Sequence, residues 1–100
     1  MMVIEFACKA KPGHYGEVSK LYSEFAADFL STHEALETVL VCGDEAAGLV
    51  RGIGLYTSRE AAESVNSEPA FASFNDAVAP LLAEPPERRE YNLLHLFTKG

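Results

Sequence analysis

Apolar and polar residues alternate along the first segment of the chain. Between Met2 and Lys11 every second residue is apolar, and a period of two places such residues on one face of a β-strand. After the break at Pro12-Gly13, the apolar residues recur at helical spacing from His14 to Leu30. The stripe that this helix would bury consists of Tyr15, Val18, Leu21, Tyr22, Phe25, Phe29 and Leu30. The chain therefore begins with a predicted strand and a predicted helix.

Two further strands are predicted in the middle of the chain. Leu36–Cys42 is rich in β-branched residues, which are enriched in strands, and Leu49–Tyr56 follows after a short loop. Gly52 and Gly54 lie two residues apart in the second of these strands, so they share a face on which two side chains are missing. We expect another group to approach that face closely.

A split helical segment comes next. Thr57 and Glu60 have the spacing of a capping box, which predicts a short helix over Ser58–Val65. Pro69 suits the first turn of a second helix. Pro80 should kink the last turn of that helix, because it lacks an amide donor.

The last predicted element is a strand over Tyr91–Phe97, apolar enough to be buried on both faces, after a charged turn at Glu87-Arg88-Arg89-Glu90. The element order is then β-α-β-β-α-β. This order is that of the ferredoxin-like α+β fold, in which helices cover one face of a four-stranded antiparallel sheet.

The other face of this sheet would carry large apolar side chains from the last strand. Such a surface is unfavourable in water, so we expect a second copy of the sheet to cover it. The residues predicted on this face are Glu5, Ala7, Lys9, Tyr91, Leu93, His95 and Phe97.

Composition narrows the class of protein. One hundred residues, 48% of them apolar, suit a single globular domain over residues 1–100. The net charge of −7 and the scattered basic residues disfavour nucleic acid and anionic membranes as partners. The N-terminus lacks a basic region and an uninterrupted apolar run. Cys8 and Cys42 form no metal or redox motif. We expect a cytoplasmic protein.

Three short segments resemble the antibiotic biosynthesis monooxygenase (ABM) family of the dimeric α/β-barrel superfamily. These segments are Tyr56-Thr57-Ser58-Arg59-Glu60-Ala61, Ser67-Glu68-Pro69-Ala70-Phe71 and Ala79-Pro80-Leu81-Leu82. The resemblance implies a homodimer with facing sheets and a small-molecule pocket between sheet and helices. Members of the family include cofactor-independent oxygenases of polycyclic aromatics, haem-degrading enzymes, isomerases of small metabolites and many proteins with no assigned reaction, and the fold alone does not choose among them.

The chain departs from this family at two positions. An aromatic residue, often tryptophan, commonly ends the third strand in the family, and Tyr56 stands there in this chain. A histidine commonly lies in the following helix, where this chain reads Ser64-Val65-Asn66. The haem-degrading set of Asn, His and Trp is therefore absent as a set.

Three residues are candidates for catalysis. His95, in the predicted last strand, is either a core or interface histidine or the general base of a pocket. Tyr56 is either a packing residue or a hydroxyl donor into the pocket. Asn66 is either a turn-forming residue or a polar group that takes the role a histidine has in relatives.

Four more residues are candidates for substrate binding. Arg51 would pair with an acid or bind a substrate carboxylate or enolate. Glu5 and Lys9 could reach the face of His95 and orient its ring or shift its pKa, and Tyr91 would share that face. No metal site is predicted, because the three histidines fall on different elements.

These observations lead to two functional hypotheses. The first is a dimeric enzyme of the monooxygenase type that acts on a small apolar or aromatic metabolite without a cofactor. A base removes a proton from the substrate and donors hold the anion in this mechanism. The second is a non-catalytic small-ligand-binding or interaction module of the same fold.

Overall fold

Strands and helices follow one another along the chain in the predicted order, β-α-β-β-α-β. The computed structural model describes residues 1–100. Its strands are β1 (Met2–Lys9), β2 (Leu36–Asp44), β3 (Leu49–Tyr56) and β4 (Glu87–Asn92). Its helices are α1 (Tyr15–Thr32), α2 (Arg59–Ser64) and α3 (Pro69–Val78), with 3₁₀ turns η1 (Val65–Ser67) and η2 (Ala79–Leu81). None of these helices is long and apolar enough to cross a membrane.

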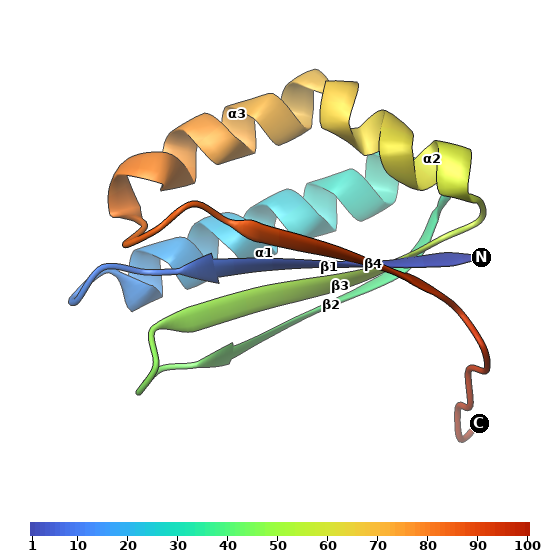
Figure 1. Ribbon diagram of the computed structural model, residues 1–100, viewed down its shortest axis with the longest axis horizontal. Helices are drawn as coiled ribbons and strands as arrows, with labels where there is room; N and C mark the ends of the chain where they lie inside the picture. The colour runs from blue at the N-terminus through green and yellow to red at the C-terminus, as the bar shows by residue number, and fades with distance from the viewer.

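The four strands form one antiparallel sheet in the order β2-β3-β1-β4. All helices lie on one side of it, so the other side, which we call the open face, is uncovered (Figure 1). This arrangement is the ferredoxin-like α+β fold that the sequence predicted. Because β2 and β4 are the two outer strands, each has one edge without a partner strand.

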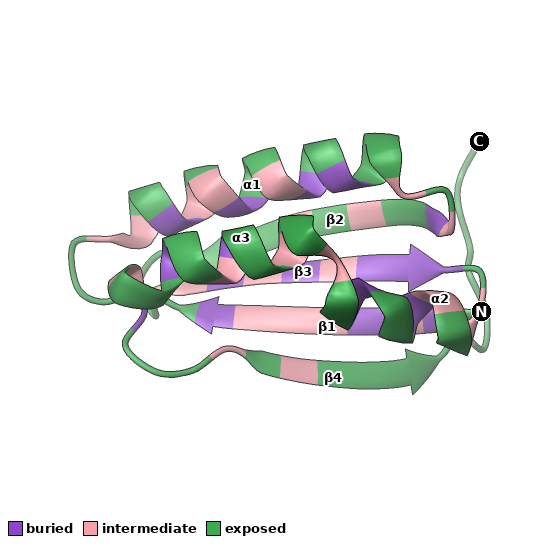
Figure 2. Ribbon diagram, turned by 90° about the horizontal axis from the view of Figure 1, so that it is seen from above, coloured by how far each residue is buried: buried purple, intermediate pink, exposed green.

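Two buried clusters fill the space between sheet and helices. Four residues at helical spacing on α1 face the sheet and are buried: Val18, Tyr22, Ala26 and Phe29. Figure 2 shows this buried stripe along the lower side of the helix. One cluster contains Cys8, Ala10, Val18, Tyr22, Ala26, Val50, Phe74, Val78 and Leu82. The other contains Met2, Ile4, Phe29, Leu36, Tyr56, Ala62 and Val65.

The split helical segment follows its predicted proline positions, with one change at its start. Pro69 lies in the first turn of α3, and the turn with Pro80 tightens to 3₁₀ geometry after Val78. The predicted cap at Thr57 is wrong by one residue. Ser58 is the N-cap of α2, and its Oγ accepts a hydrogen bond of 3.1 Å from the Ala61 N–H.

The last strand was predicted too close to the C-terminus, at Tyr91–Phe97, whereas the observed strand is Glu87–Asn92. The observed β4 includes the charged residues that were assigned to a turn and ends at Asn92, which pairs with Met2. One more backbone hydrogen bond, from the Leu93 N–H to the Met1 carbonyl at 3.1 Å, follows this pair, and the residues after it belong to no strand. Charges are common on edge strands, where they hinder unwanted pairing, which accounts for a strand that reads ERREYN.

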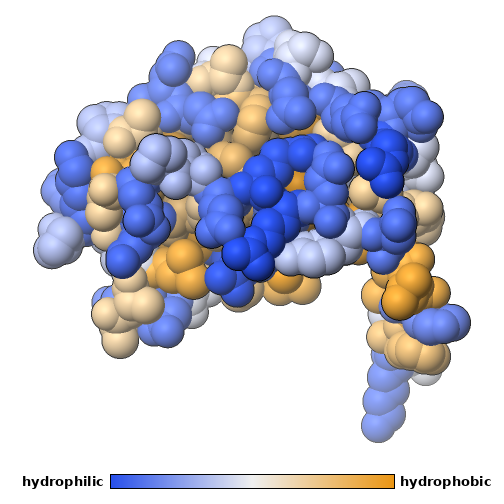
Figure 3. All heavy atoms as spheres, in the orientation of Figure 1, coloured by the Kyte–Doolittle hydropathy of each residue, from blue (hydrophilic) through white to orange (hydrophobic).

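The residues that follow β4 form a terminal segment outside the sheet. Leu94 and Phe97 are 83% and 87% exposed, in contrast to the burial on both faces that was predicted for them. Figure 1 shows the segment bending to the side of the sheet opposite the helices. In Figure 3 apolar side chains gather on this segment, below a body that is mostly polar in this view.

Candidate functional site

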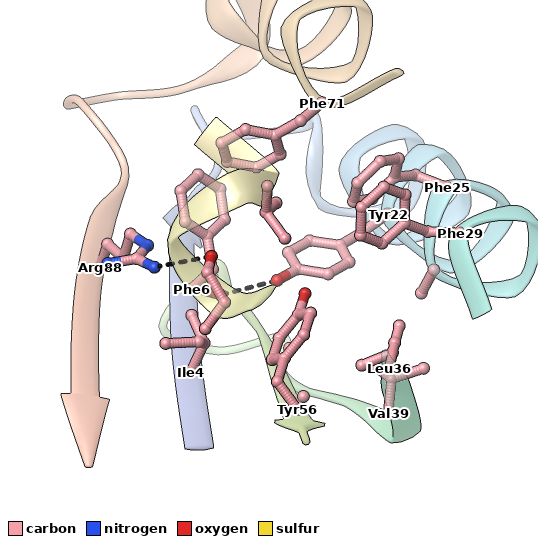
Figure 4. Close-up of a pocket in the computed structure, with 15 residues that line it drawn as sticks. Ile4, Phe6, Tyr22, Phe25, Phe29, Leu36, Val39, Tyr56, Phe71 and Arg88 are labelled. Carbon is pink, nitrogen blue, oxygen red and sulfur yellow. Dashed lines mark hydrogen bonds between the residues drawn. The ribbon is translucent and has the colours of Figure 1, made fainter. Parts of the chain in front are cut away.

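A cavity lined mainly by apolar side chains lies between the sheet and the helices. It encloses about 60 Å³, enough for several water molecules, each of which needs about 10–15 Å³ on this scale. Figure 4 shows aromatic rings from α1, β1 and α3 turned toward it. Its 15 lining residues are Ile4, Phe6, Tyr22, Phe25, Ala26, Phe29, Leu36, Val39, Gly52, Gly54, Tyr56, Ala62, Val65, Phe71 and Arg88.

The two glycines of β3 form one wall of the cavity. A Cβ atom at Gly52 would overlap the hydroxyl of Tyr22, and one at Gly54 would lie 3.2 Å from the Tyr56 ring. The missing side chains therefore make room for two phenol rings. The predicted close approach to this face is confirmed.

The hydroxyl of Tyr22 has a structural role. It donates a hydrogen bond of 2.8 Å to the carbonyl oxygen of Phe6. Burial raises the pKa of Tyr22 far above its ordinary value, with a smaller contribution from Cys8. Because this phenol stays neutral and already donates its proton to Phe6, it has no proton left to donate to a ligand.

The hydroxyl of Tyr56 is in a different situation. Its ring is buried and lines the cavity, and its oxygen makes no hydrogen bond with another protein group. Burial raises the pKa of Tyr56 to about 12, although the charge of Arg88 acts in the opposite direction. A phenol with that pKa is protonated at neutral pH, so Tyr56 can donate a hydrogen bond but cannot serve as a base.

Arg88 brings the only charge among the lining residues. It extends from β4 on the helix side of the sheet, and its side chain is 24% exposed. One Nη donates to the Ala62 carbonyl at 3.3 Å, and the other donates to the carboxylate of Glu90. This pairing fixes the guanidinium at the cavity wall and lowers the pKa of Glu90. Arg88 was missed because its segment was interpreted as a turn.

His33, which follows the end of α1, is half-buried beside Tyr56. The two rings meet edge to face at a centroid distance of 5.9 Å, and Phe29 lies 4.9 Å from the imidazole on another side. Its Nδ1 is buried without a hydrogen-bond partner. His33 supports the position of Tyr56 from outside the cavity, since it is not a lining residue.

Two predicted catalytic residues lie away from the cavity. Asn66 is exposed in the turn η1. His95 is exposed in the terminal segment, where its ring contacts Phe97. The position predicted for His95, inside the last strand, was wrong because that strand ends at Asn92; its role as a base is untested.

The predicted substrate-binding residues lie on the open face. Arg51 and Glu5 form an ion pair with 2.9 Å between Nε and Oε1, and the Tyr91 hydroxyl donates to the other Glu5 oxygen at 3.2 Å. The predicted sharing of one face by Glu5 and Tyr91 is confirmed. Lys9 is exposed at the end of β1. The sheet separates all four from the cavity, and no cluster suited to a metal ion occurs in the chain.

Several solved structures share this fold over nearly its whole length. One, from Caulobacter crescentus CB15, is named provisionally as an antibiotic biosynthesis monooxygenase; it has a TM-score of 0.83 and 17% identity over 94% of this chain and 90% of its own. Rv0793 from Mycobacterium tuberculosis has a TM-score of 0.82 and 13% identity, covering 97% and 98%. A variant of SnoaB, a cofactor-independent oxygenase from Streptomyces nogalater, has a TM-score of 0.78 and 13% identity, covering 98% and 97%.

These likenesses establish the fold alone, because the identities are low. No family model matches the sequence. No curated protein matches it either.

Proposed function

We propose that the protein is a cofactor-independent enzyme of the monooxygenase type that oxidises a small aromatic or largely apolar metabolite in this cavity. The observation that carries the proposal is the pair of polar groups at an otherwise apolar wall, the unpartnered Tyr56 hydroxyl and the fixed Arg88 guanidinium. A donor and a cation in an aromatic cavity suit a flat substrate that becomes an anion. The shared fold with SnoaB supports the same assignment.

The proposed chemistry uses electrons that the substrate itself supplies. An activated C–H of a quinol-like or anthrone-like ring loses its proton, and the anion is held by Arg88 and Tyr56. The carbanion reduces O₂ as a C–O bond forms, which gives a peroxide anion that takes up a proton. The hydroperoxide then loses water, so one oxygen atom remains as a ketone and the other leaves in water.

The acceptor of the substrate proton lies outside the lining residues. They include no histidine, lysine or carboxylate. Stabilisation of the anion by Arg88 lowers the pKa of the substrate C–H, which makes water or buffer a sufficient acceptor for an acidic substrate. The enzyme is proposed to work as a homodimer through its open face.

The absence of a base from the cavity lining also favours a second candidate function. A non-catalytic module that binds a small aromatic anion needs the aromatic walls, the cation and the donor, but no proton acceptor. The two functions differ in whether O₂ is consumed once the ligand is bound.

Oxygen uptake with an anthrone or quinol probe tests the proposal. With EDTA present, wild-type protein is expected to consume O₂ and form the ketone. Tyr56→Phe is expected to lower kcat by roughly 100-fold, as for removal of one donor to a developing anion. The matched control is Tyr15→Phe, which removes a hydroxyl outside the cavity. Tight probe binding without O₂ uptake would favour the binding module, and equal rates for both variants would remove Tyr56 from the site.

A further inference from the structure

We propose that the ring of Phe71 occupies the place that the substrate ring takes in the cavity, and that the substrate is a single-ring phenol or quinol that displaces it. The inference rests on the proposed function and narrows its substrate class from aromatic metabolites in general to those with one ring. It starts from the size of the cavity.

The cavity is too small for an aromatic ring. It encloses about 60 Å³, whereas an apolar cavity of about 150 Å³ is known to hold one benzene molecule. Protein interiors are close-packed, so a cavity grows only when a group that lines it moves. A ring can therefore enter only if one of the lining side chains gives up its place.

Four of the six aromatic rings that line the cavity are held firmly. Phe29 and Tyr56 are only 5% and 6% exposed. Tyr22 is fixed by the hydrogen bond of its hydroxyl. Phe25 lies between the rings of Phe29 and Phe74, which stack on it at centroid distances of 5.1 and 4.5 Å. Moving any of these rings would break a stack, a hydrogen bond or a buried contact.

Phe71 is held less firmly than the other rings. It is half-buried in the first turn of α3, and Figure 4 shows its ring on the α3 side of the cavity, next to Phe6. It meets the ring of Phe6 by its edge at 5.2 Å and that of Phe25 at 6.1 Å, and neither contact is a stack. Phe6 itself belongs to β1, which is paired on both sides. A change of rotamer, without movement of the backbone, is enough to displace Phe71.

The room that Phe71 leaves determines the size of the substrate. It is the room of one six-membered ring, and a substrate ring placed there regains the aromatic contacts with Phe6 and Phe25. The existing 60 Å³ adjoins it and can take the oxygen substituents of that ring, at the wall that carries Tyr56 and Arg88. The two further fused rings of an anthrone have no corresponding space. The cavity therefore suits a single-ring substrate.

Binding measured without turnover tests the displacement. The probe is 2-hydroxyacetophenone, a single-ring phenol with a ketone, titrated into the full-length protein under nitrogen. Phe71→Ala is expected to bind it about tenfold more tightly than the wild type, because no protein ring has to be displaced first. A fixed wall residue would give the opposite sign, since its removal would only take contacts away from the ligand. Unchanged or weaker binding by Phe71→Ala would overturn the displacement.

Two more variants keep this test decisive. Leu81→Ala removes a half-buried apolar side chain outside the cavity lining, and its dissociation constant should stay within about twofold of the wild-type value. Phe71→Leu keeps an apolar side chain at position 71 and is the variant to use if Phe71→Ala does not fold by circular dichroism. It should also bind the probe more tightly than the wild type, and a folded Phe71→Leu that does not would overturn the displacement.

A three-ring probe tests the substrate class. 1-Hydroxyanthraquinone carries the same phenol and ketone on three fused rings, and the wild type is expected to bind it at least about tenfold more weakly than 2-hydroxyacetophenone. Equal or tighter binding of the three-ring probe, or no binding of either probe, would overturn the inference. Oxygen uptake separates it from the proposed function. Tighter binding by Phe71→Ala without oxygen uptake would support the displacement and reject the enzyme, whereas uptake with unchanged binding would do the reverse.

Discussion

The phenol ring of Tyr22 occupies the space that a side chain at Gly52 would need. The ring is held there by its hydrogen bond to the Phe6 carbonyl and by edge-on contact with Phe74, at a centroid distance of 5.2 Å. The contact joins α1 to the centre of the sheet. One wall of the cavity therefore depends on the absence of a single Cβ atom.

Gly52→Ala is expected to destabilise the protein by about 1–3 kcal/mol, the usual range for overpacking a filled core. The displaced Tyr22 ring would lose its bond to Phe6. Urea unfolding followed by circular dichroism measures the change. The control is Gly16→Ala on the exposed side of α1, where a Cβ meets nothing within 4 Å; this change should be neutral or stabilise by up to about 1 kcal/mol. Equal stability of the two variants would contradict the account of the wall.

Ser58→Ala is expected to lower the free energy of unfolding by about 1 kcal/mol, since it removes the side-chain acceptor for the Ala61 N–H. Thr57→Ala should change it by less than about 0.5 kcal/mol, because Thr57 is exposed and makes no capping bond. Urea midpoints of the two variants decide between the observed cap and the one predicted from the sequence.

The alkaline limit of stability should depend on Cys8. Burial raises its pKa from 9.0 to about 12, so the unfolded thiol loses its proton before the folded one. The stabilisation from Cys8 is therefore complete below pH 9 and is lost between pH 9 and 12, at up to about 1.4 kcal/mol per pH unit. Urea midpoints measured against pH are expected to fall less steeply in this window for Cys8→Ala. Identical slopes would contradict the burial of a neutral thiol.

Arg88→Gln is expected to lower kcat/KM for an acidic aromatic substrate by roughly 100-fold, because it removes the only charge at the cavity wall. Arg88→Lys should restore part of the loss, since it keeps the charge but not the planar fork. Arg89→Gln is the control, because Arg89 lines the open-face pocket with Glu5 and Arg51. The comparison requires steady-state O₂ uptake over a range of substrate concentrations. A loss in Arg89→Gln as large as in Arg88→Gln would argue against the assignment.

The sequence predicted the fold well because its signals were local or periodic. Alternation along β1, helical spacing along α1 and the two prolines of the split segment depend on neighbouring residues. The paired glycines of β3 also predicted a close approach, although Tyr22, which makes it, is thirty positions earlier in the sequence. Only packing across the sheet could identify that partner.

The site was harder to predict because the position of β4 is set by its pairing with β1, which is distant in the sequence. The apolar run from Tyr91 to Phe97 looked like the better strand, and the charged run before it like a turn. The observed strand is instead Glu87–Asn92, because these residues pair with Met2–Ala7 of β1. The shift brought Arg88 to the cavity and left His95 outside it. The alternation of Glu87, Arg89 and Tyr91 against Arg88 and Glu90 was the signal that could have revealed the strand.

His95→Ala is expected to keep kcat within about twofold of the wild-type value, because the imidazole is exposed in the terminal segment and is not a lining residue of the cavity in its own chain. Steady-state O₂ uptake should be measured at protein concentrations where sedimentation shows the same oligomeric state for variant and wild type. His14→Ala, at the N-cap position of α1 and outside the cavity lining, provides the control. A loss of turnover in His95→Ala alone, with the oligomer unchanged, would restore His95 as the base.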